Sequence, residues 1–303
     1  MTPLSDAAAS SAAEPGLFAA LIDDAAVFPP GLAPLPDAVR EHRVHRTSRY
    51  AALIGPLLVP ASGAAELVEL VPPRAEALRV GLIARPGTPL HIVTDALHLL
   101  REHPQVEVSA VEVGWSPEWR DLDLGVLEQV PALVLEVPRG TDQLHALDDI
   151  AEAGASGTAA SDAVLAKFRT GATPAWAWPD EEELAAFLHA ATTRRLPFKL
   201  TGGLHHAVRG TYGVKGKGGE QKAEEQHGLL NVLCAVAGAV DGLNPESLAH
   251  LLTERDPEPL AREVAALTAA DAERVRVLFT AYGCCGVTDP VTELSELKLI
   301  EEM

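Results

Sequence analysis

The amino-acid sequence predicts an α/β fold of the (β/α)8 TIM-barrel class, with a helical insertion before the last strand, and three observations support this prediction. Short and nearly continuous apolar runs alternate with amphipathic segments at roughly 25–32-residue intervals, which is typical of buried parallel strands joined by crossover helices. Eight such units fit within the 303 residues. The G-x-G-x-x-G turn of the alternative, a doubly wound dinucleotide-binding sheet, is absent.

Each expected strand is a short apolar run, followed by a turn or by a segment that starts a helix. Pro60 and Pro138 close two of these runs, since proline interrupts regular structure. In chain order the expected strands are the segment near Leu21, Leu53–Val59, Leu78–Ala84, Val106–Val113, Ala132–Val137, Val164–Phe168, Pro197–Thr201 and Val275–Tyr282.

The expected helices lie between these strands. The clearest start signal is Pro179-Asp-Glu-Glu-Glu183, which resembles a capping box. In chain order the expected helices are Leu35–Ser48, Gly63–Leu70, His91–Glu102, a weaker helix leading to Val130, Thr141–Glu152, the helix from Pro179 to Thr193, and Val291–Leu299.

The chain is expected to form one domain, residues 17–303, after a flexible lead-in of residues 1–16. The repeat is interrupted by residues 209–270, which we expect to form a lid-like loop and a helical insertion. The glycine- and lysine-rich loop ends near Gly219, and the helices expected after it are Ala223–Val240, Pro245–Thr253 and Pro259–Leu267. The alternative is a solvated surface insertion without a role at the site.

Composition and charge restrict the class of protein. Apolar residues make up 47% of the chain, and the formal net charge is −19, from 43 acidic and 24 basic side chains. This charge disfavours nucleic acid and anionic membrane surfaces as partners. The first residues do not resemble a signal peptide, and the apolar run Leu229–Val240 is too short to span a bilayer. We therefore expect a cytoplasmic protein that acts on a small molecule, as a monomer or as a homo-oligomer.

Polar side chains gather where the expected strands end. In a parallel barrel the carboxyl ends of the strands and the loops after them form the active-site face. The residues expected to be catalytic are Lys167, Lys199 and Glu112. The residues expected to bind substrate are Asp23, Asp24, Glu136, Arg169, Thr201, Gly202, Gly203, His205, His206, Arg209, His227, Asn231 and Cys285.

The two lysines are the most informative members of this set. Burying a lysine ammonium costs several kcal/mol unless the group is paired or neutralised. If Lys167 and Lys199 face inward from neighbouring strands, each is expected to lower the pKa of the other, so that one is a neutral amine able to form a Schiff base with a carbonyl compound. The alternative is that the lysines pair with Glu112 or Glu136 in a buried charge network.

Two motifs resemble those of deoxyribose-phosphate aldolases. The segment Lys167-Phe-Arg-Thr-Gly171 is similar to the K-x-x-T-G Schiff-base strand of that family, and Lys199-Leu-Thr-Gly-Gly203 is similar to its K-x-S/T-G-G motif on the next strand. The segment Leu21-Ile-Asp23 is faintly similar to the I-D-H-T opening of the family, and Glu112 lies where the family keeps an acidic residue.

This resemblance implies class I aldolase-like lyase chemistry on a small carbonyl substrate, phosphorylated or not, without a cofactor or a metal. Lys167 would form the imine, Lys199 would tune its reactivity and Glu112 would transfer protons. The glycines Gly202–Gly203 and the turn Gly283–Gly286 would approach a phosphate. The segments KFRTG, PFKLTGGLHHAVR and HGLLN are also similar to a group of uncharacterised bacterial proteins of about this length, which implies no particular activity.

Histidines and cysteines leave other chemistries open. His205, His206 and His227, together with Asp23 or Glu136, are residue types that bind divalent metals, which would suit a metal-dependent hydrolase or isomerase. A barrel that binds a ligand without catalysis is a further alternative. The three cysteines, Cys234, Cys284 and Cys285, have no zinc-finger spacing, and either of the last two is a nucleophile candidate or a small buried turn residue.

Overall fold

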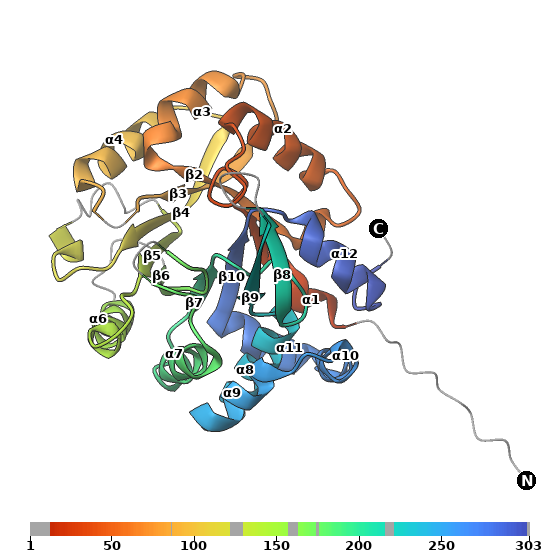
Figure 1. Cartoon of the computed structure of the whole chain (residues 1–303). Coiled ribbons are helices and arrows are strands. Elements are labelled where there is room, and N and C mark those ends of the chain that lie inside the picture. The colour runs from red at the N-terminus through yellow and green to blue at the C-terminus, as the bar shows by residue number, and fades with distance from the viewer. Residues whose placement is uncertain are drawn as a thin grey trace, which may run out of the picture.

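Eight parallel strands close into a barrel in the computed structural model, in the order β1-β10-β7-β6-β5-β4-β3-β2, which confirms the predicted (β/α)8 fold (Figure 1). The structure describes residues 13–85, 87–121, 130–156, 163–173, 176–215 and 221–301. The barrel strands are β1 (Ile22–Asp24), β2 (Ile54–Pro60), β3 (Leu78–Ile83), β4 (Val106–Gly114), β5 (Ala132–Glu136), β6 (Ala163–Arg169), β7 (Phe198–Thr201) and β10 (Phe279–Cys284).

Helices surround the barrel, as Figure 1 shows in a view along the barrel. They are α1 (Pro15–Phe18), α2 (Leu35–Arg46), α3 (Ala64–Leu70), α4 (Leu90–Arg101), α6 (Gln143–Ser156), α7 (Glu181–Thr193), α8 (Leu229–Val240), α9 (Pro245–Thr253), α10 (Pro257–Ala266), α11 (Ala269–Leu278) and α12 (Thr288–Glu296). The described residues also form the short 3-10 helices η1 (Ala51–Leu53), η2 (Ala61–Gly63) and η3 (Trp119–Asp121).

The start of α7 shows why the sequence fixes helix ends well. The Asp180 carboxylate accepts a hydrogen bond from the Glu183 backbone N–H at 2.8 Å, which satisfies a donor that the first helical turn leaves free. Glutamates at positions 181–183 also face the positive end of the helix dipole. The predicted start of this helix is therefore confirmed.

The main hydrophobic core lies between the outer faces of the strands and the helices. Phe168 of β6 stacks on Phe187 of α7 with ring centroids 4.6 Å apart, and Phe198 of β7 meets the same ring at 5.3 Å. Because successive strand residues point to opposite faces, the residues on either side of Phe168 must point into the barrel. These neighbours are Lys167 and Arg169.

The last barrel strand begins later than predicted. Residues Val275–Leu278 form the end of α11, and β10 begins at Phe279. The helix opens with a capping box between Thr268 and Asp271, and its buried residues Ala272, Val275 and Leu278 follow each other at intervals of three. This helical spacing continues into the apolar run that was assigned to the strand.

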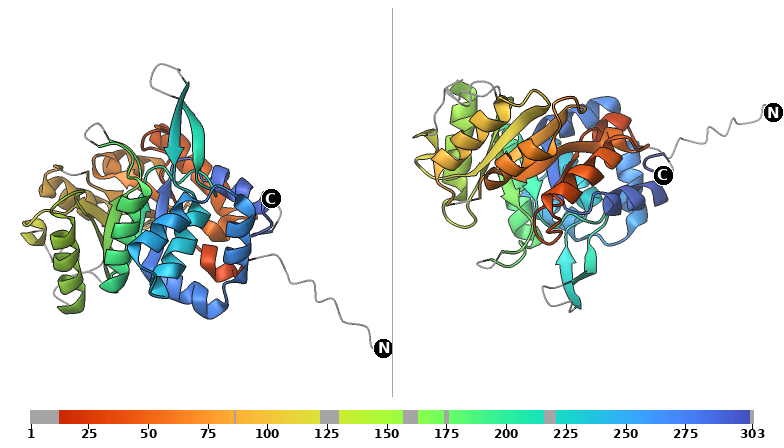
Figure 2. Two further views of the ribbon diagram at one scale, coloured as in Figure 1. Left: turned by 60° about the horizontal axis from the view of Figure 1, so that its bottom comes forward. Right: turned by 90° about the horizontal axis from the view of Figure 1, so that it is seen from above.

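The insertion contains a hairpin that the sequence did not predict. β8 (Gly210–Lys215) and β9 (Gln221–Gln226) pair as an antiparallel ribbon, which projects from the body of the barrel (Figure 2). The predicted helix start at Ala223 is therefore wrong, since α8 begins at Leu229. The helices expected after it are present as α9 and α10, and Asn244 caps α9 by accepting a hydrogen bond from the Ser247 N–H at 2.9 Å. The tip of the predicted loop, residues 216–220, lies outside the described residues.

Two other expected segments are only partly within the described residues. The weak helix leading to Val130 includes residues 122–129, which lie outside them, and the described part before these residues forms η3. Of the expected lead-in, residues 1–12 lie outside the described part, whereas the buried Ala13 donates its N–H to the Leu299 carbonyl at 3.2 Å. Among the residues that the structure describes, no helix has both the length and the apolar character needed to cross a membrane.

Candidate functional site

The ends of four neighbouring strands bring the predicted catalytic residues into register. Lys167 of β6 lies opposite Lys199 of β7, and on its other side opposite Glu136 of β5. β4 carries Glu112 two residues before its end, where Gly114 lies opposite Glu136. These side chains therefore occupy adjacent positions on the inner wall, near the carboxyl ends of their strands.

Glu112 joins the two lysines. Its Oε2 accepts a hydrogen bond from Lys167 Nζ at 2.9 Å, and its Oε1 accepts one from Lys199 Nζ at 2.5 Å. Lys167 Nζ also lies 2.9 Å from Glu136 Oε2, and Lys199 Nζ lies 2.5 Å from Asp23 Oδ2. The result is a continuous chain of charged groups, Glu136–Lys167–Glu112–Lys199–Asp23, across the barrel interior.

Arg169 extends this network towards solvent. Its Nε and Nη2 donate to the two oxygens of Glu136 at 2.9 and 3.1 Å, a bidentate arrangement that orients the carboxylate. The Arg169 side chain is 31% exposed, whereas the Lys167 side chain is only 3% exposed. The network thus holds three cations and three carboxylates, and Arg169 is its most exposed member.

The Asp23 carboxylate occupies space that Gly55 of β2 leaves open. A Cβ on Gly55 would overlap with Asp23 Oδ1, so the glycine leaves room for the carboxylate. Leu58 of β2 reaches strands on both sides of it. One of its methyl carbons lies 2.6 Å from the position of a Cβ on Gly81 of β3, and the other lies 3.3 Å from the position of a Cβ on Gly283 of β10. Because β1 lies between β2 and β10, the Leu58 side chain extends across the inner face of β1. Asp23 itself is buried, at 2% exposed.

Leu58 belongs to a small apolar cluster that is separate from the main core. Its other buried members are Ala25 and Ile83, and Phe28 packs against them. These residues lie at the ends of β1, β2 and β3 or in the loop after β1. The barrel mouth therefore has apolar side chains near the ends of β1–β3, while the charged network runs along β4–β7 and reaches Asp23 of β1.

The expectation that the lysines lower each other's pKa is wrong, because each ammonium contacts two carboxylates. Burial favours the neutral amine, but Glu136 and Glu112 outweigh it and raise the pKa of Lys167 above its ordinary value. Burial also favours the neutral amine of Lys199, but Asp23 and Glu112 outweigh it and raise the pKa of this lysine. The pairing with Glu112 and Glu136 that was considered as the alternative is present. In the resting state both lysines are therefore charged.

The carboxylates respond differently to this environment. Burial raises the pKa of Asp23, and the ammonium of Lys199 only partly offsets the effect. At Glu112 burial acts in the same direction, but Lys199 and Lys167 together lower the pKa to about 2. Asp23 is therefore the carboxylate of the network that most readily takes up a proton.

Glu112 and Glu136 should make the fold sensitive to acid. Burial opposes their ionisation, yet the neighbouring cations hold the pKa of each at about 2, below the ordinary value of 4.5. A carboxylate with a lowered pKa in the folded state stabilises the fold above its unfolded pKa, and this stabilisation is lost as the pH falls through the folded value. Each group should contribute about 3 kcal/mol that disappears between about pH 4.5 and pH 2.

Urea unfolding at a series of pH values between 5 and 2 measures this loss. The variant Glu136→Gln removes one of the two titrating groups and should show a shallower fall in the free energy of unfolding across this range. Equal slopes for the variant and the wild type would contradict the assignment of Glu136.

The glycines after β7 are used for close packing. Gly202 and Gly203 both have positive φ, 77° and 81°, which glycine adopts without strain. A Cβ on Gly203 would overlap with the ring of Trp178, and a Cβ on Gly202 would lie 3.3 Å from the Gly171 backbone. The Thr201 hydroxyl, in contrast, faces the mouth, 3.4 Å from the position of a Cβ on Gly283.

His205 contacts Cys284 and Cys285 and is not one of the residues that pair with Lys167 or Lys199. Its Nδ1 is 3.6 Å from Cys284 Sγ, and its Nε2 is 3.6 Å from Cys285 Sγ. Burial raises the pKa of the Cys285 thiol to about 11 and that of Cys284 well above its ordinary value. Both thiols are therefore protonated near neutral pH, which does not favour the nucleophilic role considered for them.

Four other predicted residues support the base of the hairpin. His206 stacks on Tyr212 of β8, and its Nδ1 lies 2.6 Å from Glu293. Arg209 pairs with Glu181 of α7, and its backbone N–H donates to Asn231 Oδ1 at 2.8 Å. His227 lies 2.8 Å from the Pro179 carbonyl, a contact that does not involve the other histidines.

Asp24 points away from the lysines. Its carboxylate contacts His42 Nδ1 of α2 at 3.0 Å and accepts the Ala26 N–H at 3.1 Å, so it fixes the loop after β1. Within the described ranges, no three His, Cys, Asp or Glu side chains are placed to hold a metal ion. The metal site considered for His205, His206 and His227 is therefore not formed there.

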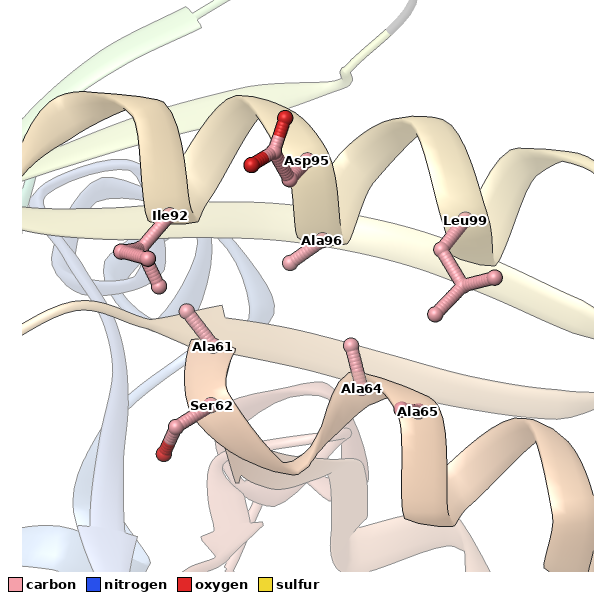
Figure 3. Close-up of a pocket in the computed structure, with 8 residues that line it drawn as sticks. All are labelled: Ala61, Ser62, Ala64, Ala65, Ile92, Asp95, Ala96 and Leu99. Atoms are coloured by element: carbon pink, nitrogen blue, oxygen red, sulfur yellow. The ribbon is translucent and has the colours of Figure 1, made fainter.

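A shallow surface groove lies elsewhere, on the outer helix layer (Figure 3). It runs between η2 with α3 on one side and α4 on the other. The residues that line it are Ala61, Ser62, Ala64, Ala65, Ile92, Asp95, Ala96 and Leu99. Because no predicted site residue lines this groove, we place the candidate site in the barrel.

Sequence reasoning missed several residues that shape the site without belonging to the charged network. Gly55 and Gly81 interrupt otherwise apolar strands, and a glycine inside a strand signals close approach of another group. This signal was available. Leu58, His42 and Trp178 have no comparable signal, because a single leucine, histidine or tryptophan is found in many structural roles.

Comparison of the chain with models of known protein families gave no match, and comparison with curated proteins also gave none.

Proposed function

We propose that this protein is an enzyme that forms or cleaves a carbon–carbon bond of a small carbonyl compound through a Schiff base on Lys167. The observation that carries the proposal is the bridging carboxylate of Glu112, which contacts Lys167 and Lys199 with one oxygen each. A buried acid placed between two amines can move protons between them during a reaction. The barrel fold, with the network near the carboxyl ends of its strands, suits an active site of this type.

The first step would be loss of a proton from Lys167. Its ammonium donates to Glu112 and lies beside Glu136, so a proton that leaves Nζ has a hydrogen-bonded acceptor. The neutral amine then attacks the carbonyl carbon and forms a carbinolamine. Protonation of its hydroxyl by Glu112 releases water and leaves the iminium ion. The carboxylates of Glu112 and Glu136 would stabilise this positive charge.

The iminium ion draws electrons from the adjacent bonds. In the cleavage direction a β-hydroxyl proton is removed, the bond between the α and β carbons breaks, and the product carbonyl leaves as an enamine forms. Protonation of the enamine carbon and hydrolysis of the imine restore Lys167. Glu112 would return the protons, and the Lys199–Asp23 pair would supply or accept them through the 2.5 Å contacts on either side of Lys199.

The choice of Lys167 over Lys199 rests on two arguments. The motif that resembles the Schiff-base strand of deoxyribose-phosphate aldolases contains Lys167. Lys167 also borders Glu136 and Arg169, the most exposed part of the network, whereas the other partner of Lys199 is the buried Asp23. Lys199 is then a positioning residue that holds Glu112 and Asp23.

Borohydride trapping tests the proposal. The protein is incubated with a panel of small aldehydes and ketones in the presence of borohydride, which reduces an imine to a stable secondary amine, and the intact mass is measured. Wild type and Lys298→Arg, which lacks an exposed lysine amine, should gain one adduct, whereas Lys167→Met should not.

The rate of trapping should also rise with pH between about 7 and 10. The pKa of Lys167 lies above its ordinary value of 10.5, so the neutral amine becomes more populated throughout this range. Absence of an adduct with every carbonyl compound would overturn the proposal.

A further inference from the structure

The apolar side of the barrel mouth faces the same interior as the charged network. Leu58 lies over the strand that carries Asp23, and its cluster partners Ala25 and Ile83 are 8% exposed each. A charged network needs no aliphatic side chains for its own stability, since polar groups would solvate it better. This apolar surface is therefore suited to contact an apolar part of a bound substrate.

The charged side offers no uncommitted cation among its members. Lys167, Lys199 and Arg169 are each within hydrogen-bonding distance of a carboxylate, and the carboxylates number three as well: Asp23, Glu112 and Glu136. An anionic substrate group would have to displace one of these carboxylates, and it would be repelled by the other two.

The glycines that resemble a phosphate-binding turn have another role. The space beside Gly203 is filled by the Trp178 ring, and Gly202 packs against the backbone of Gly171. Both contacts explain why glycine is required at these positions without invoking a ligand. An exposed cation, Arg85, lies near the apolar side, with its guanidinium carbon 5.7 Å from the centre of the Phe28 ring.

We propose that the substrate is an uncharged carbonyl compound with an aliphatic chain beside the carbonyl group, rather than a phosphate ester. The chain contacts Leu58, Ala25 and Ile83, while the carbonyl carbon meets Lys167 and its oxygen meets the Thr201 hydroxyl or Glu112. This inference rests on the proposed function, because it describes the compound that forms the imine.

The test measures how the yield of borohydride-trapped imine depends on the concentration of each compound. Unbranched aldehydes from ethanal to hexanal form one series, and glyceraldehyde with glyceraldehyde 3-phosphate forms a pair that differs by the phosphate. The half-saturating concentration should fall roughly fourfold for each added methylene until the apolar surface is covered. The half-saturating concentration of the phosphate ester should be at least about tenfold higher than that of glyceraldehyde.

Two variants locate the apolar contact. Leu58→Asn keeps the branched shape of the side chain but removes the apolar surface, so it should flatten the chain-length series. Leu90→Asn makes the same change at an exposed position of α4, 36% exposed, and should leave the series unchanged. Thermal unfolding confirms that both variants are folded. Should Leu58→Asn fail to fold, Ile83→Thr tests the same surface.

The outcomes separate this inference from the proposed function. An adduct that forms equally well with all aldehydes, or better with the phosphate ester, would overturn the inference and leave the Schiff base standing. Loss of phosphate-ester binding in Arg85→Gln would likewise show that a charged substrate is recognised. If no compound gives an adduct, both the proposed function and the inference fail.

Discussion

Replacing Glu112 by Gln is expected to slow imine formation by about 10²- to 10⁴-fold, the usual contribution of a positioned acid–base group. The amide keeps the shape of the side chain but can neither accept a proton from Lys167 nor protonate the departing hydroxyl. The rate constant of borohydride trapping at saturating aldehyde concentration measures the effect.

Glu136→Gln is the matched control. Glu136 contacts Lys167 at 2.9 Å, the same distance as Glu112 does, but it does not reach Lys199 in the network. Its removal weakens the stabilisation of the iminium charge, but it also lowers the raised pKa of Lys167 and leaves the bridging acid in place. Trapping near pH 8 should therefore slow far less in Glu136→Gln than in Glu112→Gln. If the rate constant of trapping falls by the same factor in both variants, Glu112 serves only as a charge partner and the proton-transfer role is wrong.

Replacing Lys199 by Met is expected to lower the free energy of unfolding by about 3–5 kcal/mol, because removal of one partner leaves a buried charge uncompensated. Lys199 contacts two carboxylates, Asp23 and Glu112, whose side chains are 3% and 2% exposed. Asp23 has no second cation at hydrogen-bonding distance in the network, so it is the group that suffers most from the substitution.

The double variant Asp23→Asn/Lys199→Met tests this explanation. It removes both charges of the pair, and it should recover a large part of the stability lost in the single variant. Urea unfolding of the wild type, the two single variants and the double variant forms a complete cycle. If the double variant is as unstable as the sum of the single variants, the two side chains are not coupled.

The sequence predicted the barrel and the strand ends because both depend on local patterns. Lys167, Lys199, Glu112 and Glu136 stand out as charged residues at the ends of apolar runs, and the order of strands in a closed parallel barrel places such ends together. The start of α7 at Asp180 and the cap of α9 at Asn244 also follow from local side-chain chemistry.

Local sequence patterns do not predict which charged side chains pair with each other. Lys199 and Asp23 are 176 residues apart in the sequence. Closure of the barrel brings their strands, β7 and β1, to either side of β10, so the two side chains can meet in the interior. Without that contact, two lysines on neighbouring strands suggested mutual lowering of pKa, whereas the carboxylates reverse the direction. The inward position of Leu58 depends on a register shift between β1 and β2, which a sequence pattern does not reveal.

The hairpin β8–β9 was missed for a related reason. Its strands contain glycine, lysine and glutamate, residues that seldom form strands, so their composition does not predict the antiparallel pairing. The boundary of α11 was misjudged because a helix and a strand follow each other in one apolar run, Val275–Tyr282.

Locating the imine on the chain tests the proposed Schiff base on Lys167 most directly. After reduction with borohydride in the presence of an aldehyde, the protein is digested, and tandem mass spectrometry locates the secondary amine among the six lysines of the chain. The expected result is modification of Lys167, with Lys199 unmodified. Modification confined to exposed amines such as Lys298, or to Lys199, in a folded protein would contradict it.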